Sequence, residues 1–315
     1  WNHIFVPLLR LSTSQKQRTY GMRNTLQLAM FRTCVSLLPA ATQMILDMGL
    51  ADSLRGVTHF CPPQAQKRCP VLLRIQDGQA HLQVSTIQEL QPDVIFTQST
   101  CQACLMDEEE LKNQLVGMAE PVRTLSLDPL RLEEVFGAAL QIADALGWPE
   151  QGKAYVEALR RRVDQISACL QKTPFSRCRV GFLEWLDPVF HAGHWIPDQI
   201  CLAGGVDPLA KPGQKSEPIP WESVVASDPE VLLLSPCGCT MEEICEAAHG
   251  LRKLRGWSHL RAVRAKRVYV VEPNLYTQPS ASSLVEGMEL LAHLLHPEVF
   301  PHDGNGPTRF IRFAS

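Results

Sequence analysis

The sequence predicts an α/β protein with two lobes, each a parallel sheet covered by helices. Short apolar segments without strict alternation lie on both sides of a long helical stretch at about 130–172. The two halves also repeat an order of elements, because SLLPAATQMILDMGL resembles AGHWIPDQICLAGGV and STIQELQPDVIFTQSTC resembles WESVVASDPEVLLLSPCG. We therefore expect two similar lobes that face each other across one cleft.

The first lobe begins with an apolar segment at 34–38, which predicts a strand. Pro39 then starts a helix that ends near Gly49, since proline is favoured in the first helical turn and glycine just past the last. Further strands are predicted at 54–60, 93–98 and 122–127. They are apolar without alternation, which is typical of a parallel sheet covered on both faces.

Two amphipathic helices predict the connection between the lobes. Apolar side chains recur at spacings of three and four over 132–146 and again after the break at 147–149. Strands at 178–185, 231–236 and 267–271 and a final helix at 283–295 predict the second lobe. We place an N-terminal α/β lobe at 33–148, a linking helix at 149–173, a C-terminal α/β lobe at 174–300 and a tail at 301–315, of which 301–310 looks loop-like.

Residues 1–32 differ from the rest in composition, since no acid occurs before Asp47. We expect a disordered or targeting tail there, with residues 1–29 outside the fold. The eleven irregularly spaced cysteines and the lack of a secretory signal pattern favour an intracellular protein over a secreted one. The net charge of −3 argues against a nucleic-acid surface and a polybasic membrane surface. No apolar run reaches the roughly 20 residues that cross a bilayer.

Ligands of open α/β sheets bind beyond the carboxyl ends of the strands. The helix that starts at Pro39 also offers free N–H groups to a polar ligand edge. The candidate ligand-binding residues that follow predicted strands are Pro39, Ala40, Ala41, Thr42, His59, Cys61, Glu184, Trp185, His191, His194, Trp195, Cys237 and Tyr276.

Cysteines after two of these strands open two other interpretations. Cys101 and Cys104 have the spacing of a metal or redox pair, and with His59 and Cys61 they predict a candidate site for Zn or Fe. The same pair at a helix start would suit a thiol-dependent enzyme or redox protein. The sequence contains no Walker loop, GxGxxG, GxSxG or HExxH motif. The site is therefore better suited to holding a molecule than to transforming one.

Several motifs resemble one known family. They are VSLLPAAT (35–42), GVTHFC (56–61), PDVIFTQ with CQAC (92–104), FLEWLDPVFHAGHWIP (182–197), LAGG (202–205), DPEVLLLSPCG (228–238) and LVEGMELLAHLLHPEVF (284–300). Together they resemble the cobalamin and iron-siderophore ABC-transporter substrate-binding proteins, with the class III periplasmic-binding-protein fold, in particular the cobalamin-binding branch. The resemblance implies two Rossmann-like lobes joined by a long backbone helix, a bulky ligand in the cleft, and delivery to a membrane permease.

The resemblance also suggests a role for the aromatic and imidazole side chains of 182–197. Trp185 and Trp195 would offer flat apolar surface, and His191 and His194 polar or metal-seeking contacts, which suits a corrin ring. We expect a non-enzymatic binding protein for cobalamin, a related corrinoid or another tetrapyrrole or metal chelate. The alternatives are a receptor that binds Zn, Fe or Co directly through Cys and His, and an enzyme that uses Cys101 or Cys104.

Overall fold

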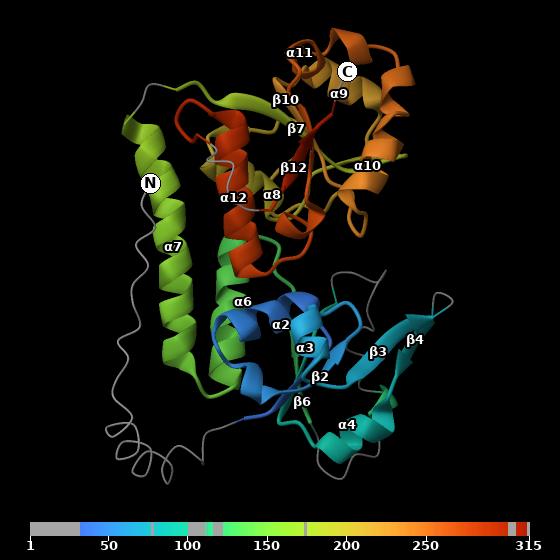
Figure 1. The fold of residues 1–315 in the computed structure, drawn as a ribbon, viewed down its shortest axis with the longest axis vertical. Coiled ribbons are helices and arrows are strands. Elements are labelled where there is room, and N and C mark those ends of the chain that lie inside the picture. The colour runs from blue at the N-terminus through green and yellow to red at the C-terminus, as the bar shows by residue number, and fades with distance from the viewer. Residues whose placement is uncertain are drawn as a thin grey trace.

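The computed structural model describes residues 32–76, 79–99, 111, 113–115, 122–172, 175–301 and 307–313. They form two lobes, each built on one six-stranded sheet. Figure 1 shows the first sheet below, the second above, and the long helices α6, α7 and α12 beside them. The α/β class and the two-lobed arrangement predicted from the sequence are confirmed.

The sheet of the first lobe has the order β4-β3-β2-β1-β5-β6. Its pairs are parallel except for the antiparallel pair of β3 and β4. Every predicted strand of this lobe is present, whereas the β3–β4 hairpin was not predicted. The elements are β1 (Cys34–Ser36), α2 (Pro39–Asp47), η1 (Ala51–Ser53), β2 (Leu54–Thr58), α3 (Pro63–Gln66), β3 (Val71–Gln76), β4 (Gln79–Leu82), α4 (Val84–Leu90), β5 (Val94–Thr97) and β6 (Arg123–Ser126).

The sheet of the second lobe has the order β12-β11-β10-β7-β8, and β9 pairs with β7. The predicted strands and final helix of this lobe are present. Its elements are β7 (Cys178–Leu186), β8 (Val189–His191), α8 (Ile196–Leu202), β9 (Gly205–Val206), α9 (Trp221–Ser227), β10 (Val231–Leu234), α10 (Met241–Ala248), η2 (Leu251–Lys253), η3 (Trp257–His259), α11 (Arg261–Arg264), β11 (Val268–Val271), η4 (Pro273–Leu275), α12 (Ala281–Leu295) and β12 (Phe310–Arg312).

The predicted tail at 301–315 contains a strand at 310–312, which begins at the last of the residues expected to be loop-like. These residues form β12, which pairs antiparallel with β11 at the edge of the sheet. The Tyr269 ring lies edge-on to the Phe310 ring, with centroids 5.8 Å apart, so the pairing also buries aromatic surface. Three residues are too few for a recognisable alternation, which is why the sequence did not reveal this strand.

Helices α6 (Leu132–Ala145) and α7 (Pro149–Lys172) connect the lobes as predicted. The buried face of α7 carries Val156, Leu159, Ile166 and Leu170 at helical spacing. The largest hydrophobic core runs through both lobes and these helices without a break, from β1 of the first lobe to α12 of the second. The lobes are therefore packed against common helices, although the exact boundaries given above remain a prediction.

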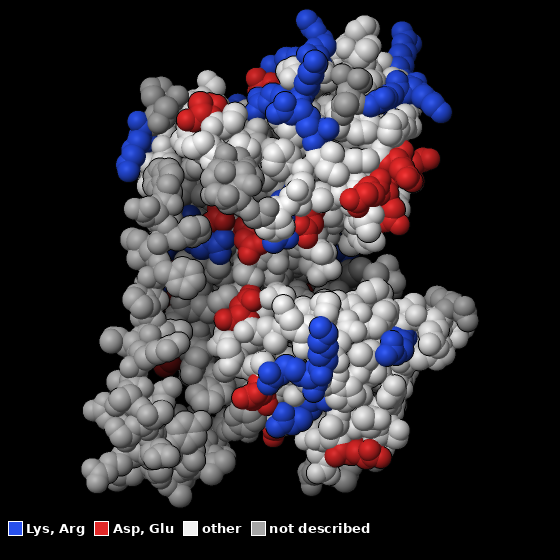
Figure 2. Space-filling view, viewed as in Figure 1, with Lys and Arg blue, Asp and Glu red and all other residues white. Residues whose placement is uncertain are grey.

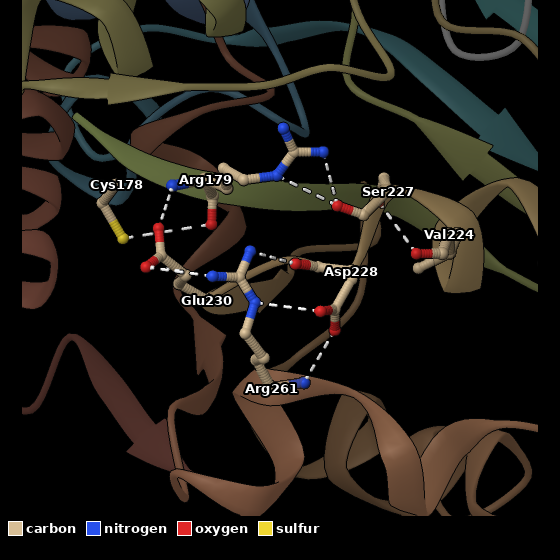
Figure 3. Close-up of polar contacts among 7 residues, drawn as sticks. All are labelled: Cys178, Arg179, Val224, Ser227, Asp228, Glu230 and Arg261. Carbon is tan, nitrogen blue, oxygen red and sulfur yellow. Dashed lines mark hydrogen bonds and ion pairs between the residues drawn. The ribbon is translucent and has the colours of Figure 1, made fainter.

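A polar network closes the amino ends of β7 and β10, away from the cleft (Figure 3). The Arg261 guanidinium donates to the Asp228 carboxylate at 2.9 Å and to the Asp228 carbonyl at 2.8 Å. Arg179 donates twice to the carbonyl of Ser227, at 3.1 and 2.7 Å, and its backbone N–H donates to Glu230 at 2.8 Å. The network therefore joins the start of α11 to the residues that enter both strands.

We expect Arg261→Ala to lower the free energy of unfolding by about 1–2 kcal/mol, because charge-assisted bonds to a carboxylate and a carbonyl are lost together. Arg264 lies on the same helix and its side chain makes no ion pair with the described residues, so Arg264→Ala should change stability by less than about 0.5 kcal/mol. Urea unfolding of both variants checks this. An equal decrease in the free energy of unfolding for both variants would mean that the hydrogen bonds of Arg261 add no stability of their own.

Candidate functional site

A cavity of about 380 Å³ lies between the two lobes. On the face shown in Figure 2 the surface is hollowed between them. The lining residues follow the carboxyl ends of strands in both sheets, which is where α/β geometry predicts a ligand. They are Leu38, Pro39, Ala40, Phe60, Gln98 and Pro129 from the first lobe, and Glu184, Gly193, His194, Trp195, Ile196, Cys237, Gly238, Tyr276, Thr277, Gln278 and Pro279 from the second.

The cavity brings together about half of the residues predicted for ligand binding. Pro39, Ala40, Glu184, His194, Trp195, Cys237 and Tyr276 line it. The described lining does not include Ala41, Thr42, His59, Cys61, Trp185 or His191. That any of these residues contacts a ligand stays a prediction.

Thr42 and Cys61 lie beneath the first turn of α2, inside the core of the first lobe. Both are buried, and the Thr42 hydroxyl lies 3.1 Å from the Cys61 sulfur. The same hydroxyl also bonds Ser36 Oγ at 2.8 Å. Ala41 is completely buried as well, because only the first residues of the helix face the cavity. These polar groups contact one another within the core, and neither Thr42 nor Cys61 is among the residues that line the cavity.

The predicted metal site is only partly within the described residues. His59 Nδ1 lies 3.1 Å from the carbonyl oxygen of Leu73, and Cys61 is in the core. Cys101 and Cys104 lie outside the described residues. Among the residues that are described, no group of three or more His, Cys, Asp or Glu side chains could hold an ion.

Trp195 and Tyr276 form a fixed aromatic wall in the second lobe. Trp195 is 8% exposed, and its indole N–H donates to the carbonyl oxygen of Tyr276 at 2.6 Å. Tyr276 is completely buried, and its hydroxyl donates to the Gly287 carbonyl at 3.1 Å. Burial raises the pKa of this phenol, so it stays protonated at neutral pH. Only the small exposed part of the uncharged Trp195 indole is therefore available to the cavity, and the buried Tyr276 fixes that ring in place.

Gln199 supports this wall and was not predicted from the sequence. Its amide N–H donates to the carbonyl oxygens of Leu275 and Leu284, at 3.3 and 2.8 Å. The side chain is completely buried, so these bonds tie α8 to the start of α12 behind Trp195. The sequence signal that could have indicated Gln199 is a single amide on an otherwise apolar helix face. The strand-end rule would also have found Gln98 and Pro129, which follow β5 and β6.

Trp185 and His191 lie beside the site on the β7–β8 hairpin. Trp185 is 41% exposed, and its indole N–H donates to the Asp187 carbonyl at 3.1 Å. His191 is buried, and its Nδ1 lies 2.5 Å from the Ala192 carbonyl oxygen. Residues 189–191 form β8, which pairs antiparallel with β7.

Glu184 and His194 of the cavity wall also have shifted pKa values. Burial raises the pKa of Glu184 to about 7, although the Gly193 N–H donates to its carboxyl at 2.5 Å. Burial lowers the pKa of His194, and nearby Lys215 lowers it further. The imidazole is therefore neutral at pH 7, whereas the carboxyl is close to half-protonated.

Polar contacts tie the lobes together at two places. Arg131, before α6, makes a bidentate ion pair with Asp198 of α8, in which Nε and Nη2 donate to the two carboxylate oxygens at 2.8 and 2.7 Å. Elsewhere, the Asp47 carboxylate at the end of α2 accepts hydrogen bonds from Tyr155 of α7 at 3.0 Å and from Ser282 of α12 at 2.5 Å. The second contact joins the first lobe, the linking helix and the second lobe at one carboxylate.

Comparison with known proteins identifies a family. The periplasmic binding protein family matches residues 34–275. The chain is 24% identical over 284 residues to an uncharacterised ABC transporter substrate-binding lipoprotein, YvrC, of Bacillus subtilis, covering 84% of this chain and 80% of that protein. None of the described helices combines the length and apolar character that a membrane span requires.

Solved structures share the fold. The periplasmic vitamin B12 binding protein BtuF of Vibrio cholerae has a TM-score of 0.63 at 21% identity, covering 87% of this chain and 99% of that one. A periplasmic heme binding protein from Pseudomonas aeruginosa has a TM-score of 0.64 at 23% identity, covering 88% and 99%. The resemblance to ABC-transporter substrate-binding proteins inferred from the sequence motifs is confirmed.

The expectation of an intracellular location is wrong. The matching family consists of periplasmic binding proteins, and the Bacillus subtilis relative is a lipoprotein. The inference relied on cysteine usage, which is weak here because thiols such as Cys34 and Cys178 are buried in the core. A buried thiol acts as a small apolar side chain in any compartment.

Proposed function

The chain belongs to the periplasmic binding protein family, and from this premise we propose that it captures a corrinoid in the cavity between its lobes for delivery to an ABC-transporter permease. Cobalamin is the leading candidate, and heme or another metal chelate is the alternative. The observation that carries the proposal is that apolar side chains from both lobes line one cavity, with Trp195 from the second lobe and Phe60 and Pro39 from the first. Flat apolar surfaces on two sides favour a flat macrocycle.

The polar groups of the cavity favour a corrinoid over heme. Neutral hydrogen-bonding side chains come from Gln98, Thr277 and Gln278, and such groups complement the amides around a corrin ring. The described lining contains neither Lys nor Arg, which are the usual partners of carboxylates such as the propionates of heme. A cavity of about 380 Å³ encloses one part of such a ligand, and the remainder extends through the mouth.

Absorption spectroscopy tests the proposal directly. The purified protein is mixed with cyanocobalamin, with hemin or with a ferric siderophore, and each mixture is passed through a gel-filtration column. We expect the corrinoid chromophore to elute with the protein at one equivalent, and hemin to be retained more weakly. Retention of hemin alone would replace the corrinoid by heme, and retention of none of the three would contradict the proposal.

A further inference from the structure

The stretch between the end of α10 and the end of β11 carries an unusual concentration of cations. Residues 250–271 contain seven Lys and Arg residues and no Asp or Glu. Without these seven, the chain has 23 Lys and Arg against 33 Asp and Glu, which is a formal charge of −10. The net charge of −3, which argued against a polybasic membrane surface, is therefore an average over two regions of opposite charge.

Four of these cations have no partner of opposite charge. Arg252, Arg261 and Arg267 have partners within the fold, namely an aromatic ring, two carboxylates and two backbone carbonyls respectively. The other four are exposed and form what we call the basic face: Lys253, Arg255, Arg264 and Lys266. Within the part of the chain that the structure describes, the side chains of the basic face make no ion pair. Four uncompensated positive charges are therefore available to an external partner.

The backbone under the basic face is fixed by apolar anchors. Element η3 packs against both η2 and α11. The buried side chains of the three elements belong to one hydrophobic core cluster of the second lobe, and they include Leu251, Trp257 and Val263. The Trp257 ring stacks on the Trp221 ring, with centroids 6.1 Å apart. The cations are therefore carried on a rigid support, so little backbone entropy is lost when they bind.

The basic face lies at the end of the second lobe opposite the ligand cavity. Cys237 and Gly238 line the cavity just after the carboxyl end of β10, whereas the basic face precedes the amino end of β11, which runs parallel to β10. Figure 1 shows α11 at the upper end of the second lobe, away from the first lobe. Figure 2 shows Lys and Arg side chains gathered over that end. A partner can therefore occupy the basic face while the cavity remains open.

An exposed leucine lies among these cations and indicates the kind of partner. Leu254 is 36% exposed and stands between Lys253 and Arg255. Such a surface suits an anionic bilayer, because the cations bind headgroup phosphates and the apolar side chain enters the boundary with the acyl chains. A nucleic acid is a poorer match. The aromatic rings of this stretch, Trp257 and Tyr269, are buried and cannot stack on bases, and α11 has only four residues to place in a groove.

We propose that the basic face binds the anionic headgroups of a phospholipid bilayer, with Leu254 inserted between them. The attraction is electrostatic, so salt weakens it. Because the rest of the chain carries a formal charge of −10, repulsion favours the orientation in which this end faces the bilayer. The cavity is then directed away from the lipid and stays open to solvent. The inference does not depend on the proposed ligand, and its test uses none.

Vesicle sedimentation tests this inference. The purified protein is mixed with vesicles of phosphatidylcholine alone, or of equal parts of phosphatidylcholine and phosphatidylglycerol, at about 0.1 M salt and again at about 0.5 M salt. We expect binding only to the vesicles that contain phosphatidylglycerol, and a loss of this binding at the higher salt concentration. Binding to neither kind of vesicle, or equal binding to both, would overturn the inference.

Neutral variants locate the contact. Lys253→Gln/Arg255→Gln removes two of the four cations and should lower the partition coefficient about 25-fold, since each cation near an anionic bilayer contributes about fivefold. The matched control Lys67→Gln/Arg161→Gln changes two exposed cations elsewhere and should bind as the wild type does. Equal losses in both variants would mean that total charge and not the basic face drives binding, and the inference would fail.

The first 32 residues need a control of their own, because they contain cations and no acid. Lys16→Gln/Arg18→Gln removes two of these cations and is measured with the same vesicles. We expect it to bind as the wild type does. A loss of binding confined to this variant would assign the lipid contact to the first 32 residues and overturn the inference.

Leu254 distinguishes a bilayer from a nucleic acid. Leu254→Gln should weaken vesicle binding about 3–10-fold, whereas Leu140→Gln, which replaces a leucine 37% exposed on α6, should not weaken it. Wild-type binding by Leu254→Gln would rule out the insertion. A gel shift with a DNA duplex at about 0.1 M salt completes the test, and we expect no retention. Binding of the duplex without binding of vesicles would assign the basic face to nucleic acid and overturn the inference.

Discussion

Replacing Trp195 by alanine is expected to lower the free energy of unfolding by about 3–5 kcal/mol, because a buried indole and its hydrogen bond to Tyr276 are lost together. The same side chain lines the cavity, so affinity for the ligand should fall as well. Trp195 belongs to the hydrophobic core and also lines the cavity. Urea unfolding measures the first effect.

Phenylalanine variants separate the loss of binding from the loss of stability. Trp221 is an internal control, since it is 9% exposed and donates to the carbonyl oxygen of Arg255 at 2.9 Å, remote from the cavity. We expect Trp195→Phe to weaken cyanocobalamin binding about 3–10-fold, because it shortens the aromatic wall. Trp221→Phe should leave the dissociation constant unchanged. If both variants bind as the wild type does, Trp195 is no part of the ligand wall.

The second large effect is expected at Asp207, in the turn after β9. Burial is the main cause that raises its pKa to about 7, although the Leu209 N–H donates to the carboxyl at 2.8 Å. Between about pH 4 and pH 7 the folded protein therefore holds one proton that the unfolded chain has released. The free energy of unfolding should therefore fall by about 4 kcal/mol in all as the pH rises from about 4 to about 7. Above about pH 7 the carboxyl is ionised in both states, so Asp207 adds no further pH dependence.

Asparagine at position 207 should abolish this part of the pH dependence, because an amide keeps the acceptor for Leu209 and does not titrate. The free energy of unfolding is measured in urea at intervals from pH 4 to pH 8. Asp164 on the exposed side of α7 is the matched control, and Asp164→Asn should retain the wild-type profile. A slope that survives in Asp207→Asn would assign the titration to another group.

The fold was predictable because its signals are local. Apolar segments without alternation, Pro39 at a helix start and the spacing of three and four along α7 each indicate one element. The repeated order of elements then indicates two lobes. The strand β12 carries no such signal, since it is short and owes its conformation to pairing with β11.

The sequence predicts which segments lie at the site. It does not predict equally well which side chains of those segments point into the cavity. Successive residues of a strand point to opposite faces, so Glu184 lines the cavity while neighbouring Trp185 lies toward solvent. Along α2 the same limit separates Pro39 and Ala40, which line the cavity, from Thr42, which turns into the core. The rule that ligands bind beyond the carboxyl ends of strands therefore predicts the correct edge of the sheet. It does not show which of the residues at that edge point into the cavity.

The carboxylate of Asp47, which joins α2, α7 and α12, has a consequence for the cost of capturing a ligand. With this contact, the Arg131–Asp198 pair and a core shared by both lobes, the cavity walls hold their relative positions before the ligand arrives. Little conformational entropy is then lost on association, so affinity derives mainly from desolvated surface. Binding to such a preorganised receptor should therefore be accompanied by a negative change in heat capacity. The size of that change should follow from the apolar area buried in the cavity, with no added contribution from the ordering of a hinge.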